Sequence, residues 1–193
     1  KRAMTLNLKS PEGRDIFFKL AAKADVIVEN YRSDVKRRLG IDYDAISKIN
    51  PAIVYGSISG FGQDGPYATR PGVDEIAQGM GGLMSITGER DDYPGGGPQK
   101  VGIAITDVLT GMYASLAVTA ALTHRERTGQ GQYIDTALLD TIVAFNANQI
   151  VSYFTSGRIP IRWGNAHPQV VPYEVFATSD GHLILAVGND GQF

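Results

Sequence analysis

The sequence predicts an α/β fold in which an open parallel sheet is flanked by helices, followed by part of a smaller α+β unit. Short apolar runs of strand length alternate with helical segments over most of the chain. Apolar residues make up 43% of the 193 residues, enough for a sizeable core. Near the end, residues 174–178 and 182–187 flank Ser179-Asp180-Gly181, which indicates a hairpin.

The first part of the chain supplies alternating strands and helices. Residues 5–8 are expected to form a strand. Ser10-Pro11-Glu12 combines a capping hydroxyl, a proline at the first helical position and an acid in the first turn, so a helix is expected from there to about Lys23. The next expected elements are a buried strand over 25–29, helices over 33–39 and 42–50, and a buried strand over 52–59.

The pattern continues to about residue 153. The expected elements are a glycine-weakened helix over 73–84, a loop over 89–100, a long helix over 107–127, a strand over 132–137 and a helix to about Tyr153. We therefore expect a Rossmann-like large domain over residues 1–155, and a linker with the start of a small α+β domain over 156–193. Because the chain opens within a predicted strand without a start methionine, we expect an internal fragment that lacks the N-terminal part.

Composition narrows the function classes. The net charge of −2 gives no electrostatic reason to expect nucleic acid or an anionic membrane as partner. The uncharged run over 108–122 is shorter than the roughly 18 residues that a membrane span needs, so we expect a core helix. The chain has no cysteine, which excludes a disulfide or a thiolate nucleophile and fits a reducing, cytoplasmic location. No pair of histidines has metal-ligand spacing, so no metal is expected.

Residues 60–65 fit the pattern G-x-G-x-x-G and follow a predicted strand. A dinucleotide site also needs a helix N-terminus directly afterwards to receive the pyrophosphate. Here Pro66 and Pro71 keep the chain in a loop. We therefore expect these glycines to allow a tight turn and a close approach of another chain segment, and no nicotinamide or flavin cofactor.

A basic segment follows the strand over 25–29. It contains Arg32, Lys36, Arg37 and Arg38, at the sheet edge where open α/β folds bind ligands. These cations could hold the phosphates of a nucleotide-like cofactor. They could equally form a solvated basic face on a short helix, and spacing alone favours that alternative.

Asp107 is the single charged residue of the stretch 101–122. It could be a helix N-cap or first-turn acid, which spacing alone favours, or a carboxylate nucleophile. A helix N-terminus is expected to lower its pKa and keep it ionised. His167 lies in a predicted loop, where a lone histidine is more often structural than catalytic.

Four blocks in this order resemble the class III coenzyme A-transferases, the family that also contains formyl-CoA transferase, carnitine CoA-transferase and α-methylacyl-CoA racemase. The blocks cover residues 24–46, 50–88, 101–122 and 125–140. The resemblance implies a homodimer of interlocked protomers and a catalytic aspartate, here Asp107. In that chemistry an aspartyl-CoA thioester forms, acyl-CoA and a carboxylic acid are the substrates, and neither a metal nor a tightly bound cofactor is needed. The implied CoA contacts are Leu6, Asn30, Tyr31, Arg38 and Leu39.

Two departures from the family pattern bear on the reaction. Racemases of the family have a histidine in a G-H-D segment, and this chain has Gly72-Val73-Asp74 instead, which favours transfer over racemisation. The glycine-rich loop of formyl-CoA transferases is replaced by Ala166-His167-Pro168-Gln169, which disfavours oxalate/formate exchange. Residues 162–167, 171–173 and 188–189 resemble instead the transferases that use succinyl-CoA or a related dicarboxylate. The expected substrate pocket contains Val73, Asp74, Gln78 and His167.

Three functions thus stay open from the sequence. The first is a CoA-transferase that acts in the cytoplasm, or in an organelle matrix if the source is eukaryotic. The second is an α-methylacyl-CoA racemase or epimerase of the same family. The third is a non-catalytic module that binds acyl-CoA or a nucleotide.

Overall fold

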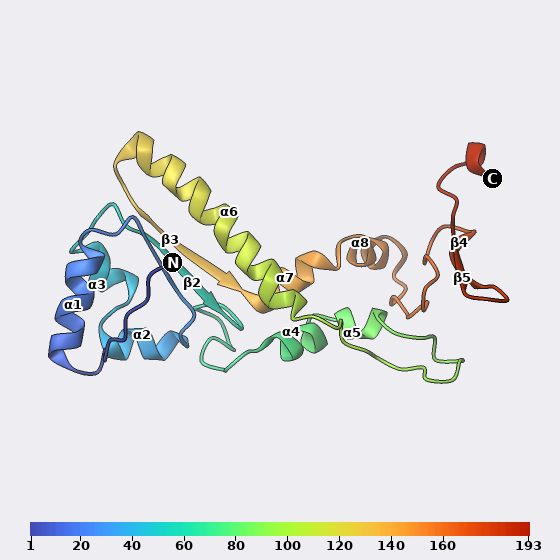
Figure 1. Ribbon diagram of the computed structural model, residues 1–193, viewed down its shortest axis with the longest axis horizontal. Coiled ribbons are helices and arrows are strands. Elements are labelled where there is room, and N and C mark those ends of the chain that lie inside the picture. The colour runs from blue at the N-terminus through green and yellow to red at the C-terminus, as the bar shows by residue number, and fades with distance from the viewer.

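The computed structural model describes residues 1–193 and contains a parallel three-stranded sheet with strand order β1-β2-β3 (Figure 1). Val26 of β1 pairs with Val54 of β2, which pairs with Gln132 of β3. The strands of this sheet are β1 (Val26–Glu29), β2 (Val54–Ser59) and β3 (Gln132–Ala137). The helices are α1 (Pro11–Ala21), α2 (Ser33–Leu39), α3 (Tyr43–Ser47), α4 (Asp74–Met80), α5 (Leu83–Ile86), α6 (Ile105–Thr128), α7 (Leu138–Phe145) and α8 (Ala147–Ser156). The predicted α/β fold is confirmed.

Local sequence signals fix several helix ends. The Ser10 hydroxyl accepts a hydrogen bond from the Gly13 amide at 3.1 Å and caps α1, with Pro11 at its first position. Asp42 caps α3 in the same way through the Ala45 amide, at 3.1 Å. Gly40 ends α2 in the left-handed conformation, with a φ of 68°. These ends lie close to those that the sequence predicts.

Two small cores hold the elements together. Ala21, Ile46, Ile53 and Tyr55 form the first, which joins α1 and α3 to β2. Ala77, Leu83, Leu138 and Ile142 form the second, which joins α4 and α5 to α7. The second core lies behind the first turn of α6, because Ile105 packs against it.

Three local expectations are wrong. Residues 5–8 form no strand; instead the Asn7 carbonyl accepts from the Ser10 amide at 3.2 Å in a turn that leads into α1. The helix over 73–84 divides at Gly82, whose φ is 88°. The helix expected to run to Tyr153 breaks between α7 and α8, where the Asn146 side-chain amide donates to the Gly81 carbonyl at 2.6 Å.

Helix α6 runs alongside β3 and contacts β2, β3 and α7 (Figure 1). Its buried residues are small or hydroxylated: Thr106, Thr110, Ala114 and Ala121. By length and composition alone this helix could cross a membrane, since an 18-residue window has a mean hydropathy of 1.4, and 22% of that window is buried. A helix that covers a sheet can have the same length and composition, and α6 contacts β2, β3 and α7, so the expectation of a core helix stays a prediction.

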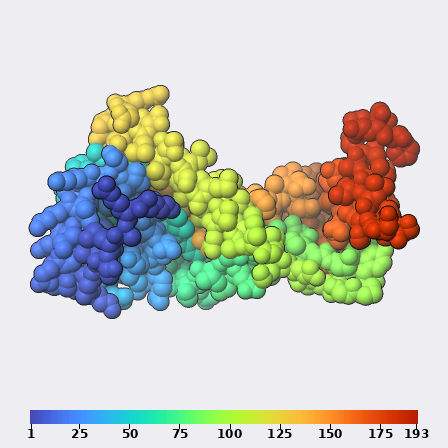
Figure 2. Space-filling view, viewed as in Figure 1, coloured from blue at the N-terminus to red at the C-terminus, as the bar shows by residue number.

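The molecule is elongated, with α1 to α3 at one end and the chain's last residues at the other (Figures 1 and 2). The last residues form the expected hairpin of β4 (Tyr173–Ala177) and β5 (His182–Ala186), followed by the short 3₁₀ helix η1 (Asp190–Gln192). Helix α8 ends at Ser156, close to the expected domain boundary at residue 155. The division into two domains stays a prediction.

Candidate active site

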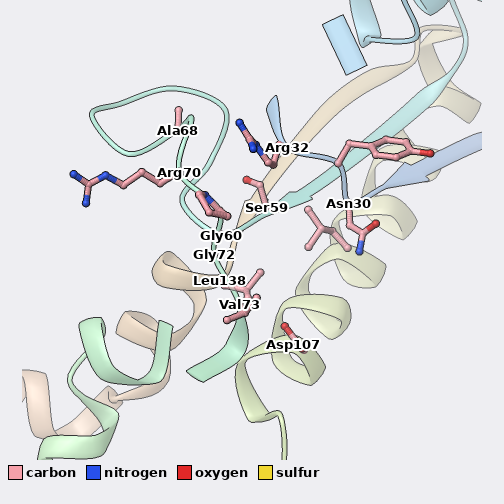
Figure 3. A pocket seen from close by; sticks show the side chains of 13 residues that line it. Asn30, Arg32, Ser59, Gly60, Ala68, Arg70, Gly72, Val73, Asp107 and Leu138 are labelled. Carbon is pink, nitrogen blue, oxygen red and sulfur yellow. The ribbon is translucent and has the colours of Figure 1, made fainter. Parts of the chain in front are cut away.

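A cavity of about 280 Å³ lies where the carboxyl ends of β1 and β2 meet the first turn of α6. Open α/β sheets bind ligands at this edge. Figure 3 shows Asp107 near one end of the cavity, beside Val73 and Leu138, whereas Arg32 and Arg70 lie beyond Ser59 and Gly60. The lining residues are Asn30, Tyr31, Arg32, Ile58, Ser59, Gly60, Ala68, Arg70, Pro71, Gly72, Val73, Asp107 and Leu138.

The loop between β2 and α4 forms one wall of this cavity. It closes on itself at Gly60 and Gly72, which approach so closely that a Cβ on either would meet the backbone of the other. Gly62 and Gly65 both have a φ of 85°. The loop contains no helix, and α4 begins only at Asp74. The expected role of these glycines in a turn and a close approach is confirmed.

Asp107 lies in the first turn of α6, three residues after the N-cap Ala104. Its carboxylate is exposed to solvent at the cavity wall. Desolvation raises the pKa of Asp107, and the nearby Asp74 carboxylate raises it further. The expected lowering of this pKa is therefore wrong. No backbone amide donates to the Asp107 carboxylate, and Asp74 takes the capping position instead.

Asp74 and Gln78 lie behind the cavity wall and hold α6 in place. One oxygen of Asp74 accepts from the Thr106 amide at 2.8 Å, within the first turn of α6. The other accepts from the Gln78 side-chain amide at 2.7 Å. Gln78 is fully buried, and its own oxygen accepts from the Val101 amide at 2.9 Å. Of the four expected pocket residues, only Val73 lines this cavity.

The turn after β1 forms the opposite wall. Asn30 and Tyr31, two of the expected CoA contacts, line the cavity together with Arg32. The other three expected contacts, Leu6, Arg38 and Leu39, do not line it. The Arg38 side chain pairs with Asp34 at 3.5 Å. Because it is 71% exposed, a ligand that extends beyond the cavity can reach it.

Lys36 does not belong to the basic surface on which the sequence places it. Its residue is only 2% exposed, and its ammonium pairs with Glu29 at 2.9 Å. The basic face of α2 therefore consists of Arg37 and Arg38, both exposed, with Arg32 just before the helix.

His167 lies outside the cavity, in the segment between α8 and β4. Its Nδ1 accepts from the Val170 amide at 3.0 Å, and its ring lies 5.2 Å from that of Tyr173. The structure therefore gives His167 contacts that organise a loop and does not bring it to Asp107.

Sequence reasoning missed Arg70, which lines the cavity with its guanidinium 4.1 Å from the Tyr67 ring. No sequence signal separates it from an ordinary loop arginine, because its cavity neighbours lie far away along the chain. Figure 3 shows its guanidinium turned away from Asp107, so Arg70 borders the cavity without directing its charge at that carboxylate. No group of three His, Cys, Asp or Glu side chains is placed to hold a metal.

Curated proteins similar to this chain are CoA-transferases. A succinate–glutarate CoA-transferase of Agrobacterium fabrum is 53% identical over 193 residues, which are 100% of this chain and 47% of that protein. A succinyl-CoA:glutarate CoA-transferase of Mus musculus is 44% identical over 193 residues, 100% of this chain and 43% of that protein. The chain thus spans about half the length of these relatives.

A solved structure has the same fold. The crystal structure of a CAIB/BAIF family protein from Brucella suis matches with a TM-score of 0.89 and 46% identity, over 99% of this chain and 50% of that one. The sequence pattern of CoA-transferase family III matches residues 1–193, the whole chain. The chain therefore belongs to CoA-transferase family III, as the four sequence blocks predict.

Proposed function

We propose that the full-length protein moves CoA from an acyl-CoA donor, succinyl-CoA or a similar dicarboxylic thioester, to a carboxylic acid acceptor, with Asp107 as nucleophile. One observation carries the proposal: the exposed Asp107 carboxylate lies on the wall of a cavity whose opposite wall carries Asn30, Tyr31 and Arg32. The names of the relatives, which specify transfer between succinate and glutarate, support the dicarboxylic donor.

In the proposed reaction the CoA group passes from donor to acceptor through an aspartyl-CoA intermediate. The Asp107 carboxylate attacks the thioester carbonyl, the C–S bond breaks, and a mixed anhydride and CoA thiolate form. The thiolate then attacks the aspartyl carbonyl, which releases the donor acid and leaves aspartyl-CoA. An acceptor carboxylate attacks this thioester, the C–S bond breaks, and a second anhydride and CoA thiolate form. The thiolate attacks its acyl carbon, so that the new acyl-CoA leaves and Asp107 is restored.

Racemisation needs a group that removes the α-proton and one that returns it. Val73 occupies the position of the racemase histidine and lines the cavity. The only carboxyl or imidazole group of this chain that lines the cavity is Asp107. This favours transfer over the racemase alternative. An exposed anion at the wall of the site also disfavours a pure binding module, because it would repel the anionic ligand without a chemical role.

The test uses Asp107→Asn in the full-length protein. Transfer from succinyl-CoA to glutarate should fall by at least about a thousandfold, because the amide cannot form the anhydride. CoA affinity should stay within about twofold of the wild type. Hydroxylamine added during turnover should convert Asp107 to a hydroxamate in the wild type, detected by peptide mass spectrometry.

The matched control is Asp64→Asn, an exposed carboxylate in the loop that does not line the cavity. It should keep wild-type turnover. Unchanged turnover in Asp107→Asn, or hydroxamate formation at another carboxylate, would contradict the assignment of the nucleophile.

We also propose that the protein acts as an interlocked homodimer in the cytoplasm or an organelle matrix, with no nucleic acid or membrane partner. Support for the dimer comes from the exposed apolar row of Val108, Met112 and Leu116 on α6, which are 51%, 63% and 68% exposed. An apolar row of this kind is typical of a surface that another chain segment covers.

A further inference from the structure

We propose that the buried cluster of Lys36, Glu29, Ser57 and Tyr133 is a positioning device that sets the turn of residues 30–32 for CoA binding. This inference rests on the proposed function, since it assigns that turn to the CoA side of the site. The cluster lies beneath the turn, where β1 ends and α2 begins. None of its four residues lines the cavity that contains Asp107.

One ammonium group joins four elements in this cluster. The Lys36 Nζ, on α2, donates to Glu29 Oε1 at 2.9 Å, Ser57 Oγ at 2.5 Å and Tyr133 Oη at 3.0 Å. Glu29 ends β1, Ser57 lies in β2 and Tyr133 lies in β3. The Ser57 hydroxyl also donates to the same Glu29 oxygen. All three ammonium donors therefore have acceptors, and α2 is tied to every strand of the sheet.

Lysine, serine and tyrosine in contact could also form a nucleophilic site, but the contacts argue against one here. Ser57 is fully buried. The Lys36 side chain is 3% exposed and its ammonium is paired with a carboxylate, so it offers no free base to a substrate. Lys36 and Tyr133 do line a second cavity, of about 380 Å³. The lysine donors, however, are all turned toward protein acceptors.

The second oxygen of Glu29 connects the cluster to the active-site turn. Glu29 Oε2 accepts from the Tyr31 backbone amide at 2.8 Å. A single carboxylate thus bonds the buried ammonium on one side and the backbone of residue 31 on the other. Farther along, the Ser33 hydroxyl donates to the Ala68 carbonyl at 2.9 Å, which ties the end of the turn to the opposite loop. The turn that presents Asn30, Tyr31 and Arg32 is held at both ends.

Burial restricts the positions that the Glu29 carboxylate can take. Two opposite charges away from water are costly unless they stay paired and hydrogen-bonded, so positions of Glu29 that leave Lys36 unpaired are disfavoured. The carboxylate is therefore kept where it also receives the Tyr31 amide. The exposed Arg32–Asp34 pair nearby, at 3.2 Å, is screened by solvent and lacks this restriction.

The experiment compares two double variants of the full-length protein. Both carry Lys36→Met, which removes the buried cation. Glu29→Gln in that background removes the anion but keeps an oxygen that can accept from the Tyr31 amide. Glu29→Leu removes the anion and the acceptor together. Both double variants avoid the unpaired buried carboxylate that Lys36→Met alone would leave, so both are expected to fold.

The readouts are the dissociation constant for CoA from calorimetry, and KM and kcat for transfer. For Lys36→Met/Glu29→Leu we expect CoA affinity to fall and KM to rise by about tenfold, with kcat within about threefold, since the chemistry at Asp107 is untouched. For Lys36→Met/Glu29→Gln, which keeps an acceptor for the Tyr31 amide but loses the ion pair that holds it in place, we expect a smaller loss of CoA affinity, of about threefold. Lys48→Met, an exposed lysine just after α3, is the matched control and should bind CoA normally.

A merely structural cluster gives a different pattern. If the cluster only stabilises the fold, CoA affinity in the two double variants would follow their free energies of unfolding. Equal CoA affinities of the Glu29→Leu and Glu29→Gln double variants, at equal stability, would overturn the proposal. A protein that shows no CoA transfer, but whose CoA affinity falls only with Glu29→Leu, would refute the proposed function and leave this inference standing.

Discussion

Gln78→Leu tests whether the hydrogen bonds behind the cavity set the position of Asp107. Gln78 is fully buried and makes two side-chain hydrogen bonds, to the Asp74 carboxylate at 2.7 Å and from the Val101 amide at 2.9 Å. Leucine has a similar volume but neither donor nor acceptor. The substitution therefore removes both bonds and leaves the packing of α4 against α7 largely intact.

The cost follows from the groups left behind. The Val101 amide is partly buried and loses its only side-chain acceptor, which costs about 1–3 kcal/mol. The Asp74 carboxylate loses a charge-assisted bond worth roughly 1.5–3 kcal/mol. The additional burial of an apolar side chain offsets about 1–2 kcal/mol of this loss. We expect a net loss of about 2–3 kcal/mol in the free energy of unfolding.

The same change should lower kcat more than it raises KM. Asp74 caps the first turn of α6 through the Thr106 amide, so a less constrained Asp74 loosens the turn that carries Asp107. A misplacement of this kind costs about tenfold or more in kcat. Urea unfolding of the full-length protein gives the stability, and steady-state transfer gives kcat and KM.

The matched control is Gln130→Leu, because Gln130 is exposed and its side chain makes no hydrogen bond in the structure. It should change stability by less than about 0.5 kcal/mol. If Gln78→Leu behaves like this control in both stability and kcat, then the bonds from Gln78 do not hold α6 and the reasoning is refuted.

Two further predictions concern pH and packing. Desolvation and the Asp74 charge raise the pKa of Asp107, so transfer should be lost on acidification at a higher pH than for an ordinary aspartate. In a pH profile of kcat/KM, Asp74→Asn should shift this loss to lower pH. An unshifted profile would remove Asp74 as a cause of the raised pKa. Gly131→Ala should destabilise the chain by about 3 kcal/mol in urea unfolding, since a Cβ there meets the backbone of Ile53. Its control, Gly111→Ala on α6, meets nothing within 4 Å and should stabilise by about 0.5–1 kcal/mol; equal effects of the two would contradict the packing.

Most of the fold could be predicted because its signals are local. Ser10-Pro11 and Gly40 mark helix ends through bonds that span only a few residues. The break between α7 and α8 could not be predicted, because it coincides with a contact between Asn146 and the Gly81 carbonyl, 65 residues apart. A periodic apolar pattern continues through that point, so the sequence alone favours one helix.

The same distinction applies to the site. Asn30 and Tyr31 follow a strand, so the rule that ligands bind at the carboxyl ends of parallel strands predicts the sheet edge where both line the cavity. Lys36 resembles its basic neighbours along the chain, but its partners Ser57 and Tyr133 lie 21 and 97 residues away. A charge pattern shows where a cation lies on a helix and does not show what buries it.

The pKa of Asp107 illustrates how two effects of one position compete. A place in the first turn of a helix favours the anion by about 0.3–1 kcal/mol, less than one pKa unit. Desolvation at the cavity wall and the Asp74 charge act in the opposite direction and prevail. For the proposed reaction this outcome is useful, because a more basic carboxylate is a stronger nucleophile. The attacking species is the carboxylate anion, so the raised pKa moves the loss of transfer activity on acidification to higher pH.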